Sequence, residues 1–276
     1  MALPADFQFS QGSLQDYVDC PRRFQLRYLL RLAWPAAEAE PALESERYLQ
    51  RGAAFHRLVH QHTLGVPLER LSGTVADEDL CRWWHNYLAQ PLDDLPPTRY
   101  AEVVLSAPVG GHRLVAKYDL VAVEAGRRAV IVDWKTYRKR PRRRWLAERL
   151  QTRVYPYVLV RAGWHLNASL PLQPEQVAMI YWFSNFPADP ERFSYDAAQY
   201  QADEVVLSSL IEEIKGLGDG DFPLTIQERR CRYCPYRSLC QRGIRAGAFD
   251  EAGEESEIRD DFDISLDLEQ IAEIEY

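Results

Sequence analysis

Residues 101–134 have the periodicity of β-strands, whereas the residues before them have that of helices. This change constrains the fold more than any other feature of the chain. Short runs rich in β-branched residues lie at 101–107, 113–123 and 129–134. Gly110-Gly111 separates the first two runs and residues 124–128 separate the last two, and both are favourable turn segments. Runs joined by such short connections usually pair with their neighbours, so the sequence predicts three adjacent antiparallel strands.

Segments of helical periodicity surround these strands. Helices are predicted at about 13–30, 45–62, 77–88, 145–161 and 197–215, and a further strand at 177–183. Ser13 is expected to be the N-cap of the first helix, with Asp16 near its N3 position, and Cys20-Pro21 is expected to interrupt that helix. A bend is expected at Pro156 in the fourth helix. Helices on both sides of a group of strands predict a mixed α/β domain with a central sheet.

Charge is distributed unevenly along the chain. The 276 residues carry a formal net charge of −8. Residues 250–276 contain twelve acidic residues and one basic residue, which give −11, so residues 1–249 carry +3. We therefore expect one domain over residues 1–249 and an acidic tail over residues 250–276. The apolar runs are shorter than the roughly 20 residues that a membrane span needs, and no signal peptide is evident, so we expect a cytoplasmic protein with no membrane partner.

Charged side chains lie at the ends of two of the predicted strands. Residues two apart in a strand point to the same face, so Asp133 and Lys135 project together, and Asp119 can approach them from the neighbouring strand. Two carboxylates at the end of a sheet suit Mg²⁺ or Mn²⁺, and a lysine beside them can orient water and phosphate. A bare D-x-K spacing more often marks a surface salt bridge. Here Ile131 and Val132 make the preceding strand apolar, and convergent charges at its end need a partner ion.

Asp119 followed by Asp133-x-Lys135 resembles the signature of the PD-(D/E)XK nucleases, and in particular of their RecB-like branch. Three further motifs in the expected order support the resemblance. They are a G-x-x-x-H helix, a Q-x-x-x-Y motif and an N-terminal helix with a Cys-Pro pair, at residues 52–56, 151–155 and 13–30. The resemblance implies an α/β, restriction-endonuclease-like core, with a central mixed sheet flanked by helices and with the N- and C-terminal segments joined by a four-cysteine cluster.

The resemblance also implies roles for single residues. His56, Asp119 and Asp133 correspond to ligands of the divalent ion, Lys135 assists the attack, and Gln151 and Tyr155 direct their side chains at the site. Alternatives remain for some of them: His56 is also compatible with an ordinary helical histidine, and Gln151 and Tyr155 with plain packing. Glu102 is a further candidate, because similar nucleases sometimes carry an auxiliary carboxylate on the first strand of this group.

A basic run begins three residues after Lys135 and leads into the helix that carries Gln151. It consists of Arg138, Lys139, Arg140, Arg142, Arg143 and Arg144, interrupted by Pro141. Such a run alone is equally compatible with a solvated loop. Its place beside a phosphodiesterase site favours contact with a nucleic-acid backbone, through salt-sensitive binding that carries no information about base sequence.

The five cysteines are arranged as metal ligands rather than as a disulfide framework, because their number is odd and three of them form C-x2-C-x5-C. These three are Cys231, Cys234 and Cys240, and four thiolates would hold either zinc or an iron–sulfur cluster. The fourth ligand must be distant, and Cys20 competes for this place with Cys81, for which an ordinary buried thiol is the simpler interpretation. The resemblance favours Cys20 and a 4Fe–4S cluster, because CRISPR-associated RecB-like nucleases and the AddB subunit place one cysteine early and three late.

The acidic tail has two interpretations. Its composition is typical of a disordered, solvated segment. However, apolar and polar residues alternate between 261 and 268, which is a strand pattern. We hypothesise that this segment adds to a sheet edge and masks the basic DNA channel.

Taken together, these features predict a Mg²⁺- or Mn²⁺-dependent DNA nuclease, and the resemblance favours an exonuclease on single-stranded ends in DNA repair, recombination or CRISPR adaptation. A non-catalytic DNA-binding subunit of a helicase–nuclease complex is the alternative. The chain contains no G-x-x-x-x-G-K-[ST] sequence, so any helicase would be a separate chain. DNA and a helicase or CRISPR adaptation proteins are therefore the expected partners.

Overall fold

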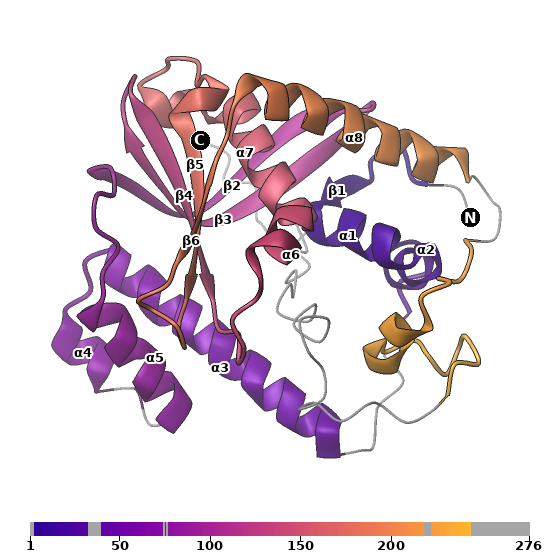
Figure 1. The fold of residues 1–276 in the computed structure, drawn as a ribbon, viewed down its shortest axis with the longest axis horizontal. Coiled ribbons are helices and arrows are strands. Elements are labelled where there is room, and N and C mark those ends of the chain that lie inside the picture. The colour runs from indigo at the N-terminus through magenta and orange to yellow at the C-terminus, as the bar shows by residue number, and fades with distance from the viewer. Residues whose placement is uncertain (1–2, 33–39, 74, 76, 218–221, 244–276) are drawn as a thin grey trace, which may run out of the picture.

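A computed structural model of the chain describes residues 3–32, 40–73, 75, 77–217 and 222–243. Its centre is a mixed sheet of six strands, which Figure 1 shows between two groups of helices. The strands are β1 (Gln8–Ser10), β2 (Thr98–Val109), β3 (His112–Glu124), β4 (Arg128–Lys135), β5 (Val177–Phe183) and β6 (Glu191–Ser194). The predicted strands at 101–107, 113–123, 129–134 and 177–183 are all confirmed.

The pairing of the strands makes the sheet mixed. β3 pairs antiparallel with β2 and with β4, as predicted, and the turn at Gly110-Gly111 joins β2 to β3. β1 runs parallel to β3 and pairs with its first residues, whereas β4 pairs with its last residues. β4 and β5 are parallel, and β6 closes the sheet antiparallel to β5. The ends of β4 and β5 therefore lie side by side.

Helices cover both faces of the sheet. They are α1 (Gln11–Asp19), α2 (Pro21–Phe24), α3 (Glu40–Thr63), α4 (Leu68–Ser72), α5 (Glu78–Ala89), α6 (Arg143–Glu148), α7 (Leu150–Ala162) and α8 (Ala197–Gly216), with a π-helical turn at Gln25–Leu29 and short 3-10 turns at Gly163–Asn167, Pro174–Gln176 and Glu228–Tyr233. Helices α1, α7 and α8 pack on one face of the sheet and form a first hydrophobic core with it. Helices α3, α4 and α5 form a second core on the other face.

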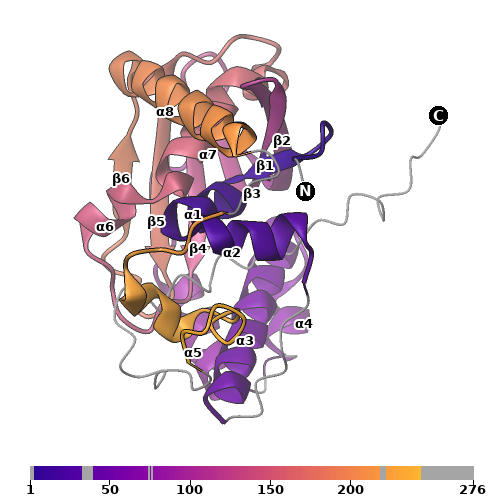
Figure 2. The same cartoon turned by 90° about the vertical axis from the view of Figure 1, so that its right-hand side faces the viewer.

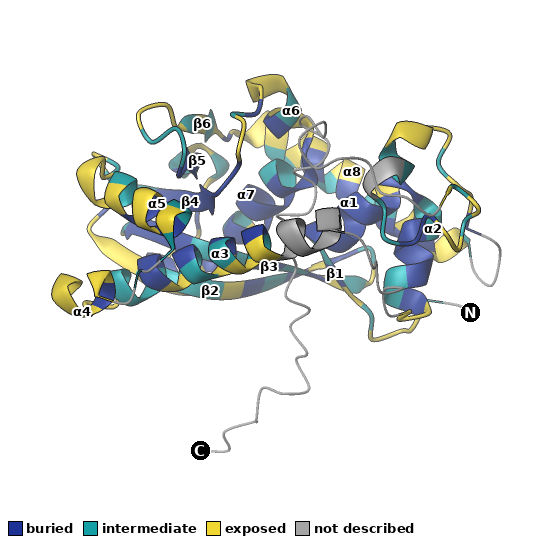
Figure 3. Cartoon of the chain, turned by 90° about the horizontal axis from the view of Figure 1, so that it is seen from below, coloured by how far each residue is buried: buried dark blue, intermediate teal, exposed yellow. Residues whose placement is uncertain are grey.

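Residue alternation along β4 divides the strand between these two cores. Ala129 and Ile131 face the core under α7, whereas Val130, Val132 and Trp134 face the core under α3. Both faces of this strand are buried, which explains its continuous apolar sequence. Figure 3 shows the consequence, since α7 and β4 are largely buried whereas α4 lies at the surface.

The start of the first helix differs from the prediction. Its N-cap is Ser10, and Ser13 occupies the N3 position. The Oγ of Ser10 accepts a hydrogen bond from the backbone N–H of Ser13 at 3.1 Å, and the Oγ of Ser13 accepts one from the backbone N–H of Ser10 at 2.9 Å. β1 therefore runs directly into α1. This strand was not predicted, because its three residues are too few to show a periodicity in the sequence. The interruption at Cys20-Pro21 is confirmed, because Cys20 is extended and Pro21 begins α2.

The helix predicted at 145–161 is divided into two helices, and a bend at Pro156 stays a prediction. The helical segment is broken at Arg149, whose extended backbone separates α6 from α7, and Pro156 lies inside α7. The first backbone N–H of α7, that of Leu150, donates to Oε1 of Gln15 in α1. The first turn of this helix therefore contacts a segment that is distant in sequence.

None of the described helices combines the length and apolar character that crossing a membrane requires.

Candidate active site

Carboxylates lie in one row across three neighbouring strands. The β3–β4 pairing ends with Leu120 opposite Val132, so one further step along this register places Asp119 opposite Asp133. In the β2–β3 pairing Glu102 lies between two paired residues and falls opposite Asp119. The approach of Asp119 to Asp133 was predicted from the strand pattern.

The row coincides with a distortion of the sheet. Tyr118 and Val121 of β3 both face the core under α7. In a regular strand, residues three apart point to opposite faces, so the alternation of β3 is interrupted between them. The facing strand has a left-handed φ of 53° at Glu102, a conformation that costs non-glycine residues about 1–2 kcal/mol. Backbone strain of this kind is concentrated at functional sites. Glu102 itself pairs with Lys117, with 2.5 Å between its Oε2 and the lysine Nζ.

Asp119 joins the strand to α3. Its Oδ1 lies 3.2 Å from Nδ1 of His56, and its Oδ2 accepts the backbone N–H of Trp134 at 2.9 Å. Burial alone would lower the pKa of His56, but the charge and hydrogen bond of Asp119 outweigh it, and the pKa is raised. Burial would likewise raise the pKa of Asp119, yet His56 and the Trp134 amide lower it. The two groups form an ion pair at the edge of the site.

Asp133 is the most deeply buried acid of the row, with 4% of its surface exposed. Its Oδ1 accepts a hydrogen bond of 2.7 Å from Nε2 of Gln151, and Lys135 Nζ lies 3.0 Å from its Oδ2. Apart from this ion pair with Lys135, Oδ2 is a buried oxygen without a hydrogen-bond partner among the described residues. Burial raises the pKa of Asp133 to about 7, and Asp119 adds to this effect, whereas Lys135 opposes it.

α7 brings the two residues of the predicted Q-x-x-x-Y motif to this site. Gln151 and Tyr155 are one turn apart on the helix and are both buried. Burial raises the pKa of Tyr155 well above its ordinary value, and the negative charges of Asp133 and Asp119 contribute, whereas Lys135 opposes them. The hydroxyl of Tyr118 donates to the backbone oxygen of Tyr155 at 2.9 Å, which fixes α7 against β3.

The glycine of the G-x-x-x-H motif allows α3 to approach the end of β4. A Cβ at Gly52 would lie 3.1 Å from Oγ1 of Thr136, which is tighter than most real contacts. One turn earlier the hydroxyl of Tyr48 donates to the backbone oxygen of Thr136. Gly52 therefore sets the distance from α3 to the residues that follow Lys135, and His56 extends from the next turn of the same helix.

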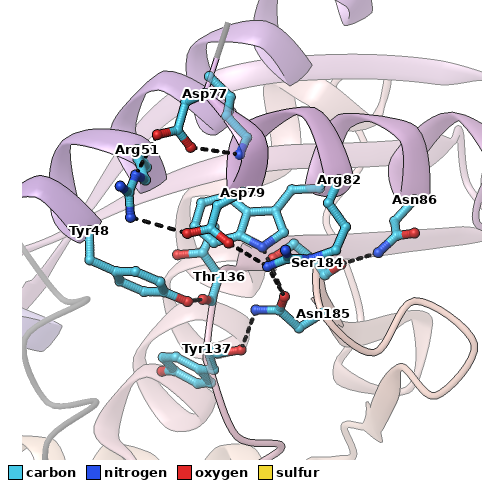
Figure 4. Close-up of polar contacts among 12 residues, drawn as sticks. Tyr48, Arg51, Asp77, Asp79, Arg82, Asn86, Thr136, Tyr137, Ser184 and Asn185 are labelled. Atoms are coloured by element: carbon cyan, nitrogen blue, oxygen red, sulfur yellow. Dashed lines mark hydrogen bonds and ion pairs between the residues drawn. The ribbon is translucent and has the colours of Figure 1, made fainter. Parts of the chain in front are cut away.

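A polar network that the sequence did not reveal holds the segment after β4 (Figure 4). Asn185, just beyond β5, donates to the backbone oxygen of Tyr137 at 2.8 Å and accepts from Nε1 of Trp83 at 2.9 Å. Arg82 bridges Asn185 and Asp79, and Arg51 of α3 pairs with Asp77 and Asp79. Its members come from four separate segments, so no local pattern could identify them.

Two arginines of the basic run pair with acidic residues of other segments. Arg140 pairs with Asp189 at 2.6 Å and with Glu191 at 2.9 Å, and Arg143 also pairs with Glu191. Arg144 pairs with Glu148 one helical turn away, and the guanidinium of Arg138 stacks over the ring of Tyr48 at 4.6 Å. These cations lie beside the end of β4, as predicted, but β6 supplies counter-charge that the sequence order did not suggest.

The four cysteines of the predicted cluster come from the two ends of the described chain. All five cysteines are free thiols, and Cys81 is exposed on α5, which contradicts the expected burial of that thiol. Burial raises the pKa of Cys231, Cys234 and Cys240, and the charge of Cys20 adds to the effect at each of them. Figures 1 and 2 show the segment around residues 222–243 beside α2, where the backbone N–H of Arg22 donates to Pro223.

Neither region is a preassembled metal cage. Among the residues that the structure describes, no three or more His, Cys, Asp or Glu side chains are gathered closely enough to hold an ion.

Asp133 of β4 is buried opposite the partly buried Asp119 of β3, and Lys135 follows two residues later on the same strand. The family model described as the PD-(D/E)XK nuclease superfamily matches residues 8–241, and the chain belongs to this superfamily. No curated protein matches the sequence.

Two solved structures are similar to the chain. One is SSO0001, with 14% identity, 86% of this chain and 87% of that chain covered, and a TM-score of 0.44. The other is a candidate exonuclease from Eubacterium rectale, with 11% identity, 75% and 79% covered, and a TM-score of 0.44.

Proposed function

We propose that this protein is a Mg²⁺- or Mn²⁺-dependent deoxyribonuclease of the RecB-like branch. The observation that carries the proposal is Asp133, a buried carboxylate beside Asp119 whose Oδ2, apart from the ion pair with Lys135, has no hydrogen-bond partner among the described residues. A buried acid with a pKa of about 7 is poorly compensated. A divalent cation would add to the counter-charge that Lys135 provides, and the carboxylate oxygens are the hard donors that Mg²⁺ and Mn²⁺ prefer.

Asp119, Asp133 and His56 would hold the ion. When bound, it would supply an activated water and neutralise charge on the phosphate. Lys135 is already directed at the carboxylate row, where its ammonium can orient a phosphate oxygen. Gln151 holds the Oδ1 of Asp133, which leaves the Oδ2 for the ion. Tyr155 stays protonated because its pKa is well above the ordinary value, so its hydroxyl can donate to the substrate.

Single-stranded DNA ends are the proposed substrate, and repair, recombination or CRISPR adaptation the proposed setting, with a helicase or adaptation proteins as partners. The cations of the run 138–144 support backbone contact, since they follow directly on the strand that carries Lys135. Their pairing with Glu191 and Glu148 means that phosphates would compete with these acids. Residues 1–249 would form the nuclease domain and residues 250–276 a separate tail.

The cysteine segment is proposed to bind a 4Fe–4S cluster, with Zn²⁺ as the alternative. The four thiols fit this chemistry because none forms a disulfide and Cys20, Cys231, Cys234 and Cys240 act electrostatically on one another. The cluster would tie α1 and α2 to the end of the domain. Iron, sulfide and zinc analysis after anaerobic purification separates the two metals: a colourless protein with zinc and no iron would contradict the cluster.

The activity is tested with end-labelled linear and circular single-stranded DNA, in the presence of Mg²⁺ or Mn²⁺ and after chelation. We expect metal-dependent degradation of the linear substrate, resistance of the circle, and loss of activity in Asp133→Ala. Cleavage of the circle would contradict the exonuclease assignment. DNA binding without cleavage by the wild-type protein would contradict the nuclease and favour the non-catalytic subunit.

A further inference from the structure

The start of α7 is capped by another helix. The side chain of its N-cap, Arg149, does not cap the helix. The first helical N–H, that of Leu150, instead donates to Oε1 of Gln15 at 3.0 Å, and both residues are buried. The first N–H groups of a helix have no partner within it, and a buried one must find a partner elsewhere. Gln15, 135 residues earlier in the chain, supplies that partner.

The amide nitrogen of the Gln15 side chain contacts the residue that precedes Cys20. This nitrogen, Nε2, donates to Oδ1 of Asp19 at 3.1 Å. Asp19 is 3% exposed, and it also accepts from Arg23 at 2.9 Å and from Arg230 at 2.6 Å. Asp19 directly precedes Cys20, and Arg230 directly precedes Cys231. The two halves of the cysteine set are therefore joined through the carboxylate that Gln15 contacts.

The residue after Leu150 is Gln151, whose side chain donates to Oδ1 of Asp133 at 2.7 Å. A continuous series of hydrogen bonds and adjacent residues thus runs from the cysteine segment to the carboxylate row. It comprises Arg230, Asp19, Gln15, Leu150, Gln151 and Asp133. All of its hydrogen bonds are 3.1 Å or shorter.

We propose that Gln15 is a positioning residue, which fixes the first turn of α7 and so holds Gln151 on Asp133, and that Arg230 and Asp19 make this position depend on the cysteine segment. The catalytic part of the inference rests on the proposed function, whereas the cap on α7 does not. A glutamine suits this place because one side chain offers both an acceptor to Leu150 and a donor to Asp19.

The first test replaces Gln15 by methionine, which keeps the length of the side chain and removes both hydrogen bonds. Gln11→Met is the matched control. Gln11 lies one turn earlier on α1, is similarly buried, and its Oε1 has no hydrogen-bond partner among the described residues. Amide hydrogen exchange measured by NMR should become about tenfold faster at Leu150 and its neighbours in the first turn of α7 in Gln15→Met alone. Unchanged exchange there would overturn the cap.

The second readout is kinetic. Gln15→Met should lower kcat about tenfold, as is common for residues that orient a ligand, with KM for DNA nearly unchanged. In a Gln151→Ala background the same substitution should have little further effect, because the residue it orients is already gone. Additive losses in the double variant would overturn the positioning role. If the wild type cleaves no DNA, the proposed function fails, while amide exchange still decides the cap.

The connection to the cysteine segment is tested with Arg230→Met, a milder change because the Arg230 side chain is partly exposed. Exchange in the first turn of α7 should become about threefold faster, less than in Gln15→Met, because Asp19 keeps Arg23 as a partner. Faster exchange confined to the segment around Arg230, with α7 unchanged, would show that the cysteine segment does not influence the active site. If Gln15→Met fails to fold, this variant still decides between coupling and its absence.

Discussion

Asp133 is placed between groups that act on its charge in opposite directions. Burial and Asp119 favour the neutral form, whereas Lys135 favours the ionised form, and the outcome is a pKa of about 7. A divalent cation that binds such a group displaces its proton into solvent at little cost near neutral pH. His56 and Asp119 behave differently, because each stabilises the charged form of the other. The pKa values of these two neighbouring carboxylates are thus shifted in opposite directions by their surroundings.

Stabilisation by metal is expected to increase as the pH rises through about 7. The pKa of Asp133 is raised in the folded protein, so without metal its contribution to stability falls as the pH rises from about 4 to about 7. The ion requires the ionised form and competes with the proton. Thermal unfolding should show a larger Mn²⁺-induced rise in Tm at about pH 8 than at about pH 6. Equal increases at both pH values, or an increase in Asp133→Ala, would contradict this account.

Asp119→Asn is expected to lower the pKa of His56. Asp119 supplies the charge and the hydrogen bond that raise this pKa against the effect of burial, and the amide removes the charge while keeping the shape. NMR titration of the His56 ring in the metal-free protein should show the change, with the other histidines unaffected. A His56 pKa that stays the same would mean that another group, and not Asp119, controls this histidine.

At the scale of elements, the position of α3 depends on a single glycine. Gly52→Ala would gain roughly 1 kcal/mol of helix propensity. Its Cβ would press on Oγ1 of the buried Thr136, and overpacking of this kind costs about 1–3 kcal/mol. We expect a net loss of roughly 1 kcal/mol in chemical denaturation, together with lower nuclease activity, because α3 carries His56.

The matched control for this substitution is the double variant Gly52→Ala with Thr136→Ala. Removal of Oγ1 relieves the close contact, so activity should be regained relative to Gly52→Ala. If the double variant is as impaired as the single one, the spacing between α3 and β4 is not what the glycine determines.

The elements whose boundaries follow from local patterns could be predicted from the sequence. β2, β3 and β4 are separated by clear turns, and α8 begins at the N-cap Asp196. The prediction failed where distant residues decide the structure. Ser10 rather than Ser13 caps α1 at the end of β1, which pairs with β3, and the first N–H of α7 donates to Gln15 of α1.

The same distinction applies to the site. Asp133 and Lys135 lie two apart on one strand, and Gln151 and Tyr155 four apart on one helix, so local geometry places each pair. The network around Asn185 and the pairing of Glu191 with the basic run depend on how β5 and β6 meet the end of β4. No spacing in the sequence encodes such contacts.

At the scale of the whole molecule, charge is divided between the body and the tail. Residues 250–276, which lie outside the described residues, carry −11 and residues 1–249 carry +3. The strand pattern predicted for this tail therefore stays a prediction. Deleting residues 250–276 should raise the affinity for single-stranded DNA at low salt, as measured by fluorescence anisotropy.

The gain should diminish as salt is added, because the masking is electrostatic. Replacing the acidic residues of the tail by their amides should reproduce the deletion. Unchanged affinity in both variants would remove the masking role.

The central claim is that the carboxylate row at Asp133 hydrolyses DNA, and it is tested most directly by separating cleavage from binding. The measurement is Mn²⁺-dependent release of nucleotides from linear single-stranded DNA, with the Kd for the same DNA determined in Ca²⁺. We predict that Asp133→Ala loses activity by at least about a hundredfold and binds DNA with a similar Kd. Cleavage by Asp133→Ala at the wild-type rate would contradict the account.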